Sequence, residues 1–353
     1  MEYLEFDSYN EMLEQMMPSS SDEDLPEFEK PTEDIQSTDD LISLIEFLKK
    51  HSLHSKAPKY HRLVMCEETI RKFNNMIGLT EPKEILATQI LSLCDTDVKT
   101  LENSGKTDVH SVLYGPPGSG KTTMANMLAE IYLKLGIVDS GKVVRGDRSN
   151  MIGEYIGETA IKTKKLLESA INGVFFLDEA YQLGHAADGN RDSFAYECVN
   201  TIVQFITENK GKFVMILAGY EEDIKGNFFA QNAGLDRRFP FKYLLKGYDE
   251  AQLLDIFKLQ AKEHGFEVSD EAITAEFFKK NKKYFEFFGG DTENLFSCCK
   301  MIHNKRMFST LKNDKELSKV DVDKGFRIFK ENKKTSQGKR DGSVGDLSFS
   351  MYS

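Results

Sequence analysis

Short apolar segments alternate with longer segments of helical periodicity through the middle of the chain. The apolar segments, each of strand length, are 111–114, 142–144, 173–177, 212–218 and 241–245. Between them, apolar residues recur every three or four positions, as they do from Met124 to Leu135. Strands that are apolar throughout and separated by helices are typical of a parallel sheet covered on both faces. We therefore predict an α/β fold whose ligands bind at the carboxyl ends of the strands.

The pattern is helical on both sides of this region. Ser37 and Thr38 are suitable N-caps for a helix with Leu41 and Leu48 on one face, so we expect a helical segment at 38–75 before an α/β domain at 76–243. After residue 243 only helical spacing remains. We expect a small all-helical lid domain at 244–330 and a polar, disordered tail at 331–353.

Residues 1–37 form an acidic arm. The first 40 residues hold fourteen Asp and Glu against the single Lys30, and residues 18–34 contain three prolines, so we expect the arm to be mostly disordered. Within residues 1–17, however, apolar residues recur at helical spacing: Tyr9, Met12, Leu13, Met16 and Met17. Two interpretations stay open, a short helix that docks on a partner or on this chain, and a disordered tail with incidental apolar residues.

Composition narrows the class of protein. The net charge is −11, so the 313 residues after the first 40 carry a net charge of only +2, and a body built to bind nucleic acid is disfavoured. The five cysteines are odd in number and lack C-x-x-C spacing, and no apolar run approaches the roughly 18 residues of a membrane span. Acidic residues near the start disfavour a leader peptide. We expect a soluble, cytoplasmic protein with no membrane partner.

A glycine-rich segment, GPPGSGKTT, lies between the first predicted strand and the following helix. It fits the pattern G-x-x-x-x-G-K-[ST], in which backbone N–H groups and the helix N-terminus surround a phosphate chain. Lys121 would reach the β- and γ-phosphates, and the Thr122 hydroxyl would bind Mg²⁺. The residues predicted to hold the nucleotide here are Gly115, Pro116, Pro117, Gly118, Ser119, Gly120, Lys121, Thr122 and Thr123.

Two carboxylates follow the most apolar predicted strand, in GVFFLDEAY at 173–181. At the carboxyl edge of the sheet, Asp178 would orient Mg²⁺ and Glu179 would polarise the attacking water. The alternative is that the pair caps the following helix. Burying two unpaired acids is costly, but it is not costly beside a divalent cation and a lysine.

With these motifs in place, the chain resembles the AAA+ ATPases, and within them the CbbX/CfxQ/SpoVK-like family that includes red-type Rubisco activases. The resemblance extends over about residues 70–330. The stretches that carry it are MIGL (76–79), GPPGSGKTT (115–123), DRSNMIGEYIGETAIKT (147–163), GVFFLDEAYQL (173–183), ILAGYEEDI (216–224) and NAGLDRRF (232–239). It implies a three-layer P-loop NTPase core with a helical lid, and ATP hydrolysis in a ring, expected to be a hexamer.

The resemblance also implies roles for further residues. Ile77 and Gly78 match the segment that contacts adenine. Tyr155, Ile156 and Gly157 match the loop that lines the pore of the ring and grips a polypeptide, although packing of Tyr155 and Ile156 in the core is the alternative.

Two arginines precede Phe239 where the family has its arginine finger. Arg238 is the predicted finger, acting on the nucleotide of a neighbouring subunit, with Arg237 as the substitute.

The chain departs from the family in the lid. Glu293 stands where relatives tend to have an arginine that senses the γ-phosphate, so that Lys300 or Arg306 substitutes for it or the lid is weakly coupled to the nucleotide. Our leading prediction is an ATPase that remodels a protein client by pulling it through a central pore. The alternative is a nucleotide-gated assembly or scaffold protein with little or no hydrolysis.

Overall fold

The computed structural model describes residues 34–95, 109–155, 157–184, 192–232, 234–311 and 314–338. Internal contacts divide them between two compact units, one running to Pro116 and from Gly120 to Lys246, the other comprising Pro117–Ser119 and the chain from Gly247. The predictions for residues 1–33, for Ile156 and for the tail beyond residue 338 lie outside the described residues. In the described part of the chain, no helix is both long enough and apolar enough to cross a membrane.

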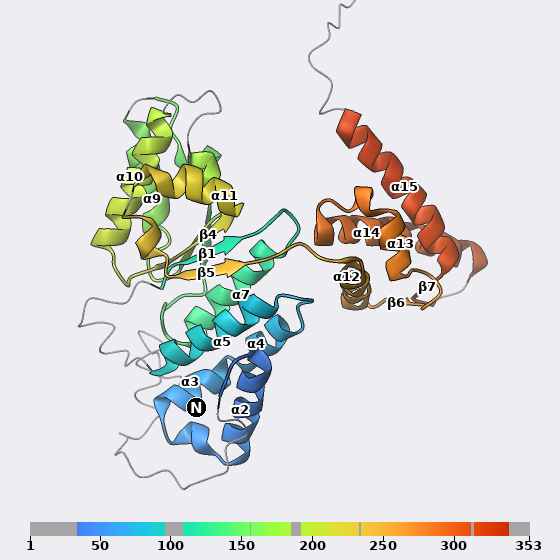
Figure 1. The fold of residues 1–353 in the computed structure, drawn as a ribbon, viewed down its shortest axis with the longest axis horizontal. Coiled ribbons are helices and arrows are strands. Elements are labelled where there is room, and N and C mark those ends of the chain that lie inside the picture. Colours follow the sequence, from blue (N-terminus) through green and yellow to red (C-terminus); the bar gives the residue numbers. More distant parts are fainter. Residues whose placement is uncertain are drawn as a thin grey trace, which may run out of the picture. The chain divides into compact units, whose positions relative to one another are not determined.

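The first unit is built on a five-stranded sheet in which every pairing is parallel. The order across the sheet is β2-β3-β4-β1-β5 (Figure 1). The strands are β1 (Ser111–Tyr114), β2 (Val143–Gly146), β3 (Val174–Leu177), β4 (Val214–Gly219) and β5 (Phe241–Leu244). All five predicted strands are therefore present, and their ends agree with the prediction to within two residues.

Helices cover both faces of this sheet (Figure 1). Successive strand residues point to opposite faces; Leu113 and Phe176 join one buried cluster, whereas Val112 and Phe175 join the other. The helices of the first cluster are α2 (Thr38–Lys50), α3 (Pro58–Met65), α4 (Glu67–Asn74), α5 (Thr80–Asp95) and α7 (Lys121–Lys134). Those of the second include α8 (Arg148–Met151), α9 (Glu158–Glu168) and α10 (Ser193–Glu208). The predicted three-layer α/β core is confirmed.

In the residues that the structure describes, the second unit has four α-helices, the short helix η6 (Lys282–Tyr284) and two short strands. The helices are α12 (Glu250–Glu263), α13 (Ala275–Lys280), α14 (Phe288–Thr310) and α15 (Lys319–Gly338). Strands β6 (Glu267–Val268) and β7 (Glu316–Leu317) pair in parallel, so the prediction of an all-helical lid was wrong in this detail.

The end of α15 also differs from the prediction. The helix continues to Gly338, whereas we expected a disordered tail from residue 331. Lys333 explains the extension, since its Nζ lies 2.7 Å from the carboxylate of Asp291 on α14, which is only 2% exposed. The same ammonium lies over the rings of Phe287 and Phe329, at 5.4 and 5.5 Å from their centroids. These contacts hold the last turns of α15 against α14.

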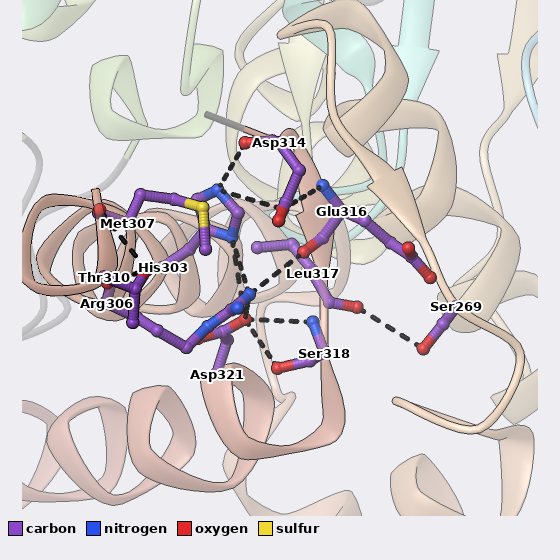
Figure 2. A network of polar contacts seen from close by, with 10 residues as sticks. All are labelled: Ser269, His303, Arg306, Met307, Thr310, Asp314, Glu316, Leu317, Ser318 and Asp321. Carbon is purple, nitrogen blue, oxygen red and sulfur yellow. Dashed lines mark hydrogen bonds and ion pairs between the residues drawn. The ribbon is translucent and has the colours of Figure 1, made fainter. Parts of the chain in front are cut away.

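A buried polar network joins α14, β7 and α15 (Figure 2). The carboxylate of Asp321, which is fully buried, accepts hydrogen bonds from Arg306 Nε at 3.0 Å and from Arg306 Nη2 at 2.7 Å. Ser318 donates to the same carboxylate through its backbone N–H and its hydroxyl. His303 lies beside the pair, with Nε2 3.0 Å from the carbonyl of Asp314. The network therefore fixes the start of α15 against α14.

Candidate nucleotide-binding site

The glycine-rich loop connects β1 to α7. β1 lies between β4 and β5 in the sheet, and the Gly115 N–H donates a hydrogen bond to the Gly219 carbonyl at the end of β4. Gly118 and Gly120 have φ angles of 73° and 93°, a backbone region that glycine adopts without steric cost. α7 begins at Lys121, and no side chain caps its N-terminus. Its first N–H groups are therefore available to an anion.

Lys121 is a buried cation with neutral partners. Its side chain is 7% exposed, and its Nζ donates to the carbonyls of Gly115 at 2.9 Å and Pro116 at 3.0 Å. Among the residues that the structure describes, it forms no ion pair. Burial lowers the pKa of Lys121, and the negative charges of Glu179 and Asp178 partly oppose this effect. An ammonium in this setting fits a phosphate chain, because an anion would supply the charge that it lacks.

The two carboxylates follow β3, at the same edge of the sheet as the loop. Both side chains are half-buried, and the Glu179 N–H donates to the Asp178 Oδ1 at 3.0 Å. Glu179 has φ 50° and ψ 43°, a left-handed conformation that non-glycine residues rarely adopt and that is often found at functional sites. It precedes the short helix η2 (Ala180–Leu183) but makes no side-chain cap hydrogen bond to it. The helix-capping interpretation is therefore wrong for Glu179.

The donor set also suits a magnesium ion bound together with a nucleotide. In the described part of the chain, no three His, Cys, Asp or Glu residues are grouped so that they alone could hold a metal. Mg²⁺ at a nucleotide site needs only one or two protein ligands, because phosphate oxygens and waters complete its octahedron. The Thr122 hydroxyl and the Asp178 carboxylate are oxygen donors of the required kind.

Ile77 and Gly78 lie in the link between α4 and α5. Gly78 and Leu79 have φ angles of 67° and 59°, so the backbone turns sharply here. Lys83 holds the link, with its Nζ donating to the carbonyls of Asn74 and Met76 at 2.8 and 2.9 Å. The link belongs to the same unit as the sheet, and its contact with adenine stays a prediction.

Tyr155 lies between α8 and α9 and is 69% exposed. The Glu158 carboxylate accepts the N–H groups of Glu154 and Tyr155, both at 3.3 Å, and so fixes the turn that carries the ring. Gly157 follows with φ 89°. The alternative that Tyr155 packs in the core is therefore wrong.

Arg238 lies at the opposite edge of the sheet from the loop. It ends η5 (Asp236–Arg238), just before β5, and the ring of the next residue, Phe239, is 5.6 Å from the ring of His110, which precedes β1. Burial and the charge of Arg238 lower the pKa of His110 to about 3. Arg238 Nε is buried with no hydrogen-bond partner among the described residues, whereas Arg237 is exposed. Arg238 is therefore placed away from the loop of its own chain.

The three residues considered for sensing the γ-phosphate, Glu293, Lys300 and Arg306, have different surroundings in the structure. Glu293 is exposed on α14. Of its two suggested substitutes, Arg306 is held by both carboxylate oxygens of Asp321 and is not available to sense a phosphate. The Nζ of Lys300 lies 5.8 Å from the centroid of the Phe266 ring.

Sequence reasoning missed Tyr181. It lies in η2, two residues after Glu179, and burial together with the neighbouring Glu179 raises the pKa of Tyr181. The available signal was its place in the stretch GVFFLDEAYQL, which we had used only for the two acids.

Taken together, the parallel sheet, the glycine-rich loop after β1 and the paired carboxylates after β3 define a P-loop ATPase of the AAA+ class. Residues 111–241 match the family described as the ATPase family associated with various cellular activities (AAA). A putative CfxQ-like protein of Acanthamoeba polyphaga mimivirus is 36% identical over 304 residues, which cover 84% of this chain and 73% of the relative.

Two further relatives agree with this assignment. The CfxQ homolog of Pyropia yezoensis is 31% identical over 297 residues, covering 82% of this chain and 93% of the relative. Stage V sporulation protein K of Bacillus subtilis is 31% identical over 211 residues, covering 59% of this chain and 64% of the relative. The chain belongs to the CbbX/CfxQ/SpoVK-like family of AAA+ ATPases, and it is an ATP hydrolase.

Proposed function

We propose that this protein hydrolyses ATP with Mg²⁺ in a ring, expected to be a hexamer, and uses the ring to pull on a protein client through a central pore. The single observation that carries the pulling function is the exposed ring of Tyr155, held on a fixed turn in the same unit as the five-stranded sheet. An exposed aromatic side chain can wedge against an extended peptide without reading its sequence.

At the nucleotide, each residue has a separate role. The backbone N–H groups of 118–122 and the ammonium of Lys121 bind the phosphates, and Thr122 and Asp178 hold Mg²⁺. The bound ion would neutralise charge on the phosphate oxygens. Glu179 orients and polarises the attacking water.

Arg238 acts on the nucleotide of a neighbouring subunit. Its place at the amino edge of the sheet keeps it from the phosphates of its own chain, which lie at the carboxyl edge. A guanidinium supplied by a second copy would stabilise charge on the γ-phosphate in the transition state. Hydrolysis would then depend on assembly, in keeping with a family whose members are generally oligomeric.

The lid favours a second candidate, a nucleotide-gated scaffold with little hydrolysis. Glu293 is exposed on α14, and Arg306 is bound to Asp321. If no cation of the second unit contacts the γ-phosphate, nucleotide binding would control the oligomeric state while ATP hydrolysis stays slow.

Substitution of Tyr155 separates the two candidates. The probe is a folded fluorescent protein that carries an unstructured tail. We expect the wild type to unfold the probe with ATP, and Tyr155→Ala to keep ATP hydrolysis within about twofold of the wild type while losing most unfolding, because the ring contacts the client and not the nucleotide. Tyr155→Phe, which keeps the ring, is the matched control. Unfolding by Tyr155→Ala at the wild-type rate would refute the pore assignment, and a wild type that assembles but barely hydrolyses ATP would favour the scaffold.

A further inference from the structure

The segment that carries Tyr155 and the turn that carries Glu179 follow neighbouring strands of the sheet. β2 ends at Gly146 and β3 ends at Leu177, and the two strands pair in parallel. The Asp178 N–H donates to the Gly146 carbonyl at 3.3 Å, so the pairing continues as far as the two carboxylates. Both segments therefore begin side by side at the carboxyl edge of the sheet.

Side chains of α9 hold the first of these segments. The Nζ of Lys162 donates to the carbonyls of Ser149 and Ile152 at 2.9 and 2.7 Å. The hydroxyl of Thr163, which is fully buried, donates to the Met151 carbonyl at 3.0 Å. The segment and α9 are therefore joined at three carbonyls, and a force on the exposed ring that the segment carries also acts on α8 and α9.

Arg148, the first residue of α8, joins this segment to the turn after Glu179. Its Nη1 donates to the Gln182 carbonyl at 2.8 Å, and the N–H of Gln182 in turn donates to the Glu179 carbonyl at 2.9 Å. Its Nη2 forms an ion pair with Asp192, the N-cap of α10. A single residue, Gln182, thus separates the guanidinium of Arg148 from the backbone of Glu179.

The turn is also held by a second side chain. Gln231, in the segment after β4, donates through its Nε2 to the Leu183 carbonyl. With Leu183 held in this way, a shift of Arg148 changes the hydrogen bonds of Gln182 rather than moving the whole turn. Glu179 has a left-handed backbone with φ 50°, which persists only where the surrounding structure holds it. The backbone at Glu179 is therefore sensitive to the position of Arg148.

We propose that Arg148 couples the two segments, so that the grip of Tyr155 on a client and the orientation of the attacking water by Glu179 depend on one another. This inference rests on the proposed function, which gives those roles to Tyr155 and Glu179. Coupling of this kind is carried by hydrogen bonds and rigid elements that connect two sites. A general base contributes only within hydrogen-bond reach of the proton that it accepts, so a small shift at Glu179 is enough to change the rate of hydrolysis.

An arginine suits this role because its planar guanidinium presents several donors in fixed directions. Arg148 uses two of its nitrogens to bind a carbonyl and a carboxylate at once. Its side chain is 40% exposed, so its removal leaves no closed cavity. Asp192 also accepts the N–H groups of Phe194 and Ala195, so α10 keeps its cap without Arg148. A variant at this position can therefore be tested in a folded protein.

The experiment compares Arg148→Gln with two controls in the full chain. Asp192→Asn removes the ion pair but keeps a good N-cap for α10 and leaves Arg148 free to bind Gln182. Arg145→Gln removes an exposed arginine of β2. For each variant, the rate of ATP hydrolysis with and without the fluorescent probe, the rate of probe unfolding, the affinity for ATP and the thermal stability are measured.

For Arg148→Gln we expect ATP hydrolysis without the probe to stay within about twofold of the wild type, because no force then acts through the segment. The number of ATP molecules consumed for each probe unfolded should rise at least about tenfold, since typical couplings between sites are about 5- to 150-fold. The affinity for ATP and the thermal stability should not change. Both controls should match the wild type in every measurement.

Three results would overturn the inference. The first is a wild-type ratio of ATP consumed to probe unfolded in Arg148→Gln. The second is an equal change of this ratio in Asp192→Asn, because the ion pair with α10 would then explain the effect. The third is a comparable loss of thermal stability, or of hydrolysis without the probe, in Arg148→Gln, which would indicate a structural role.

Tyr155→Ala, measured in parallel, separates this inference from the proposed function. If Tyr155→Ala loses unfolding of the probe while Arg148→Gln unfolds it with the wild-type consumption of ATP, only the coupling by Arg148 fails. If Tyr155→Ala unfolds the probe at the wild-type rate, or the wild type does not unfold it, the proposed function and the coupling both fail.

Discussion

Lys121 shows how the environment of one side chain indicates its ligand. The ammonium is almost fully buried, its hydrogen-bond partners among the described residues are two carbonyl oxygens, and burial lowers its pKa. A buried charge without an ion-pair partner is destabilising. The candidate site thus holds a cation that a phosphate chain would stabilise.

We expect Lys121→Ala to bind ATP more weakly than the wild type. Removing the ammonium should weaken ATP binding at least about tenfold, because hydrogen bonds to charged groups contribute about 1.5–3 kcal/mol. Isothermal titration calorimetry with ATP and Mg²⁺ measures the affinity. Lys72→Ala is the control, since Lys72 is an exposed residue on α4 that pairs with Glu68. Equal affinity of wild type and Lys121→Ala would contradict the assignment.

The positions of individual residues could be predicted where the residues belong to a motif that is continuous in the sequence. Lys121, Asp178 and Glu179 lie within continuous motifs, so the sequence alone placed them at one edge of the sheet. Contacts through space were not predictable in this way. The sequence suggested Arg306 as a phosphate sensor, but in the structure its guanidinium binds Asp321, fifteen residues away. This bond could not be predicted from the sequence because it depends on how α14 and α15 pack.

At the scale of elements, a local capping signal predicted the start of α2, whereas contacts through space set the end of α15. α2 begins at Thr38 with Ser37 as its N-cap, and a capping box with Asp40 explains the agreement. The strands were found because each is short and mostly apolar. β6 and β7 were missed because two-residue strands have no periodicity, and the end of α15 was missed because a contact between Lys333 and Asp291 sets it.

The Arg306–Asp321 pair should stabilise the second unit. Arg306→Ala removes the guanidinium that pairs with the buried Asp321 carboxylate, and we expect a loss of about 3–5 kcal/mol in the free energy of unfolding of this unit. Lys305→Ala, an exposed neighbour on the same helix, is the control. Urea denaturation followed by circular dichroism measures the difference. Equal free energies of unfolding for Arg306→Ala and Lys305→Ala would show that the Arg306–Asp321 pair does not stabilise the protein.

The same pair should give a pH dependence. Burial opposes ionisation of Asp321, but the hydrogen bonds from Arg306 and Ser318 outweigh it and lower its pKa from 3.8. A lowered pKa contributes stability that is present above the unfolded value and is lost as pH falls through the folded value. The stability difference between wild type and Arg306→Ala should therefore be constant near neutral pH and decrease below about pH 4.

At the scale of the whole molecule, the sheet separates the groups that we propose to be catalytic. Lys121, Asp178 and Glu179 lie at the carboxyl edge, whereas Arg238 lies beyond the amino edge next to His110. The fold class followed from the alternation of strands and helices, since few topologies accommodate a five-stranded parallel sheet with helices between its strands. The action of Arg238 on a neighbouring subunit was predicted from the family resemblance alone, because a second copy leaves no periodic signal in the sequence.

The central claim is that ATP is hydrolysed at sites completed by a second copy of this chain. Arg238→Ala and Glu179→Gln, each mixed only with itself, should assemble and bind ATP but barely hydrolyse it. Mixed one to one before assembly, the two variants should recover up to about a quarter of wild-type activity, since interfaces that join an intact Glu179 to an intact Arg238 then reappear. An inactive mixture of assembled variants, or full activity of Arg238→Ala alone, would contradict the account.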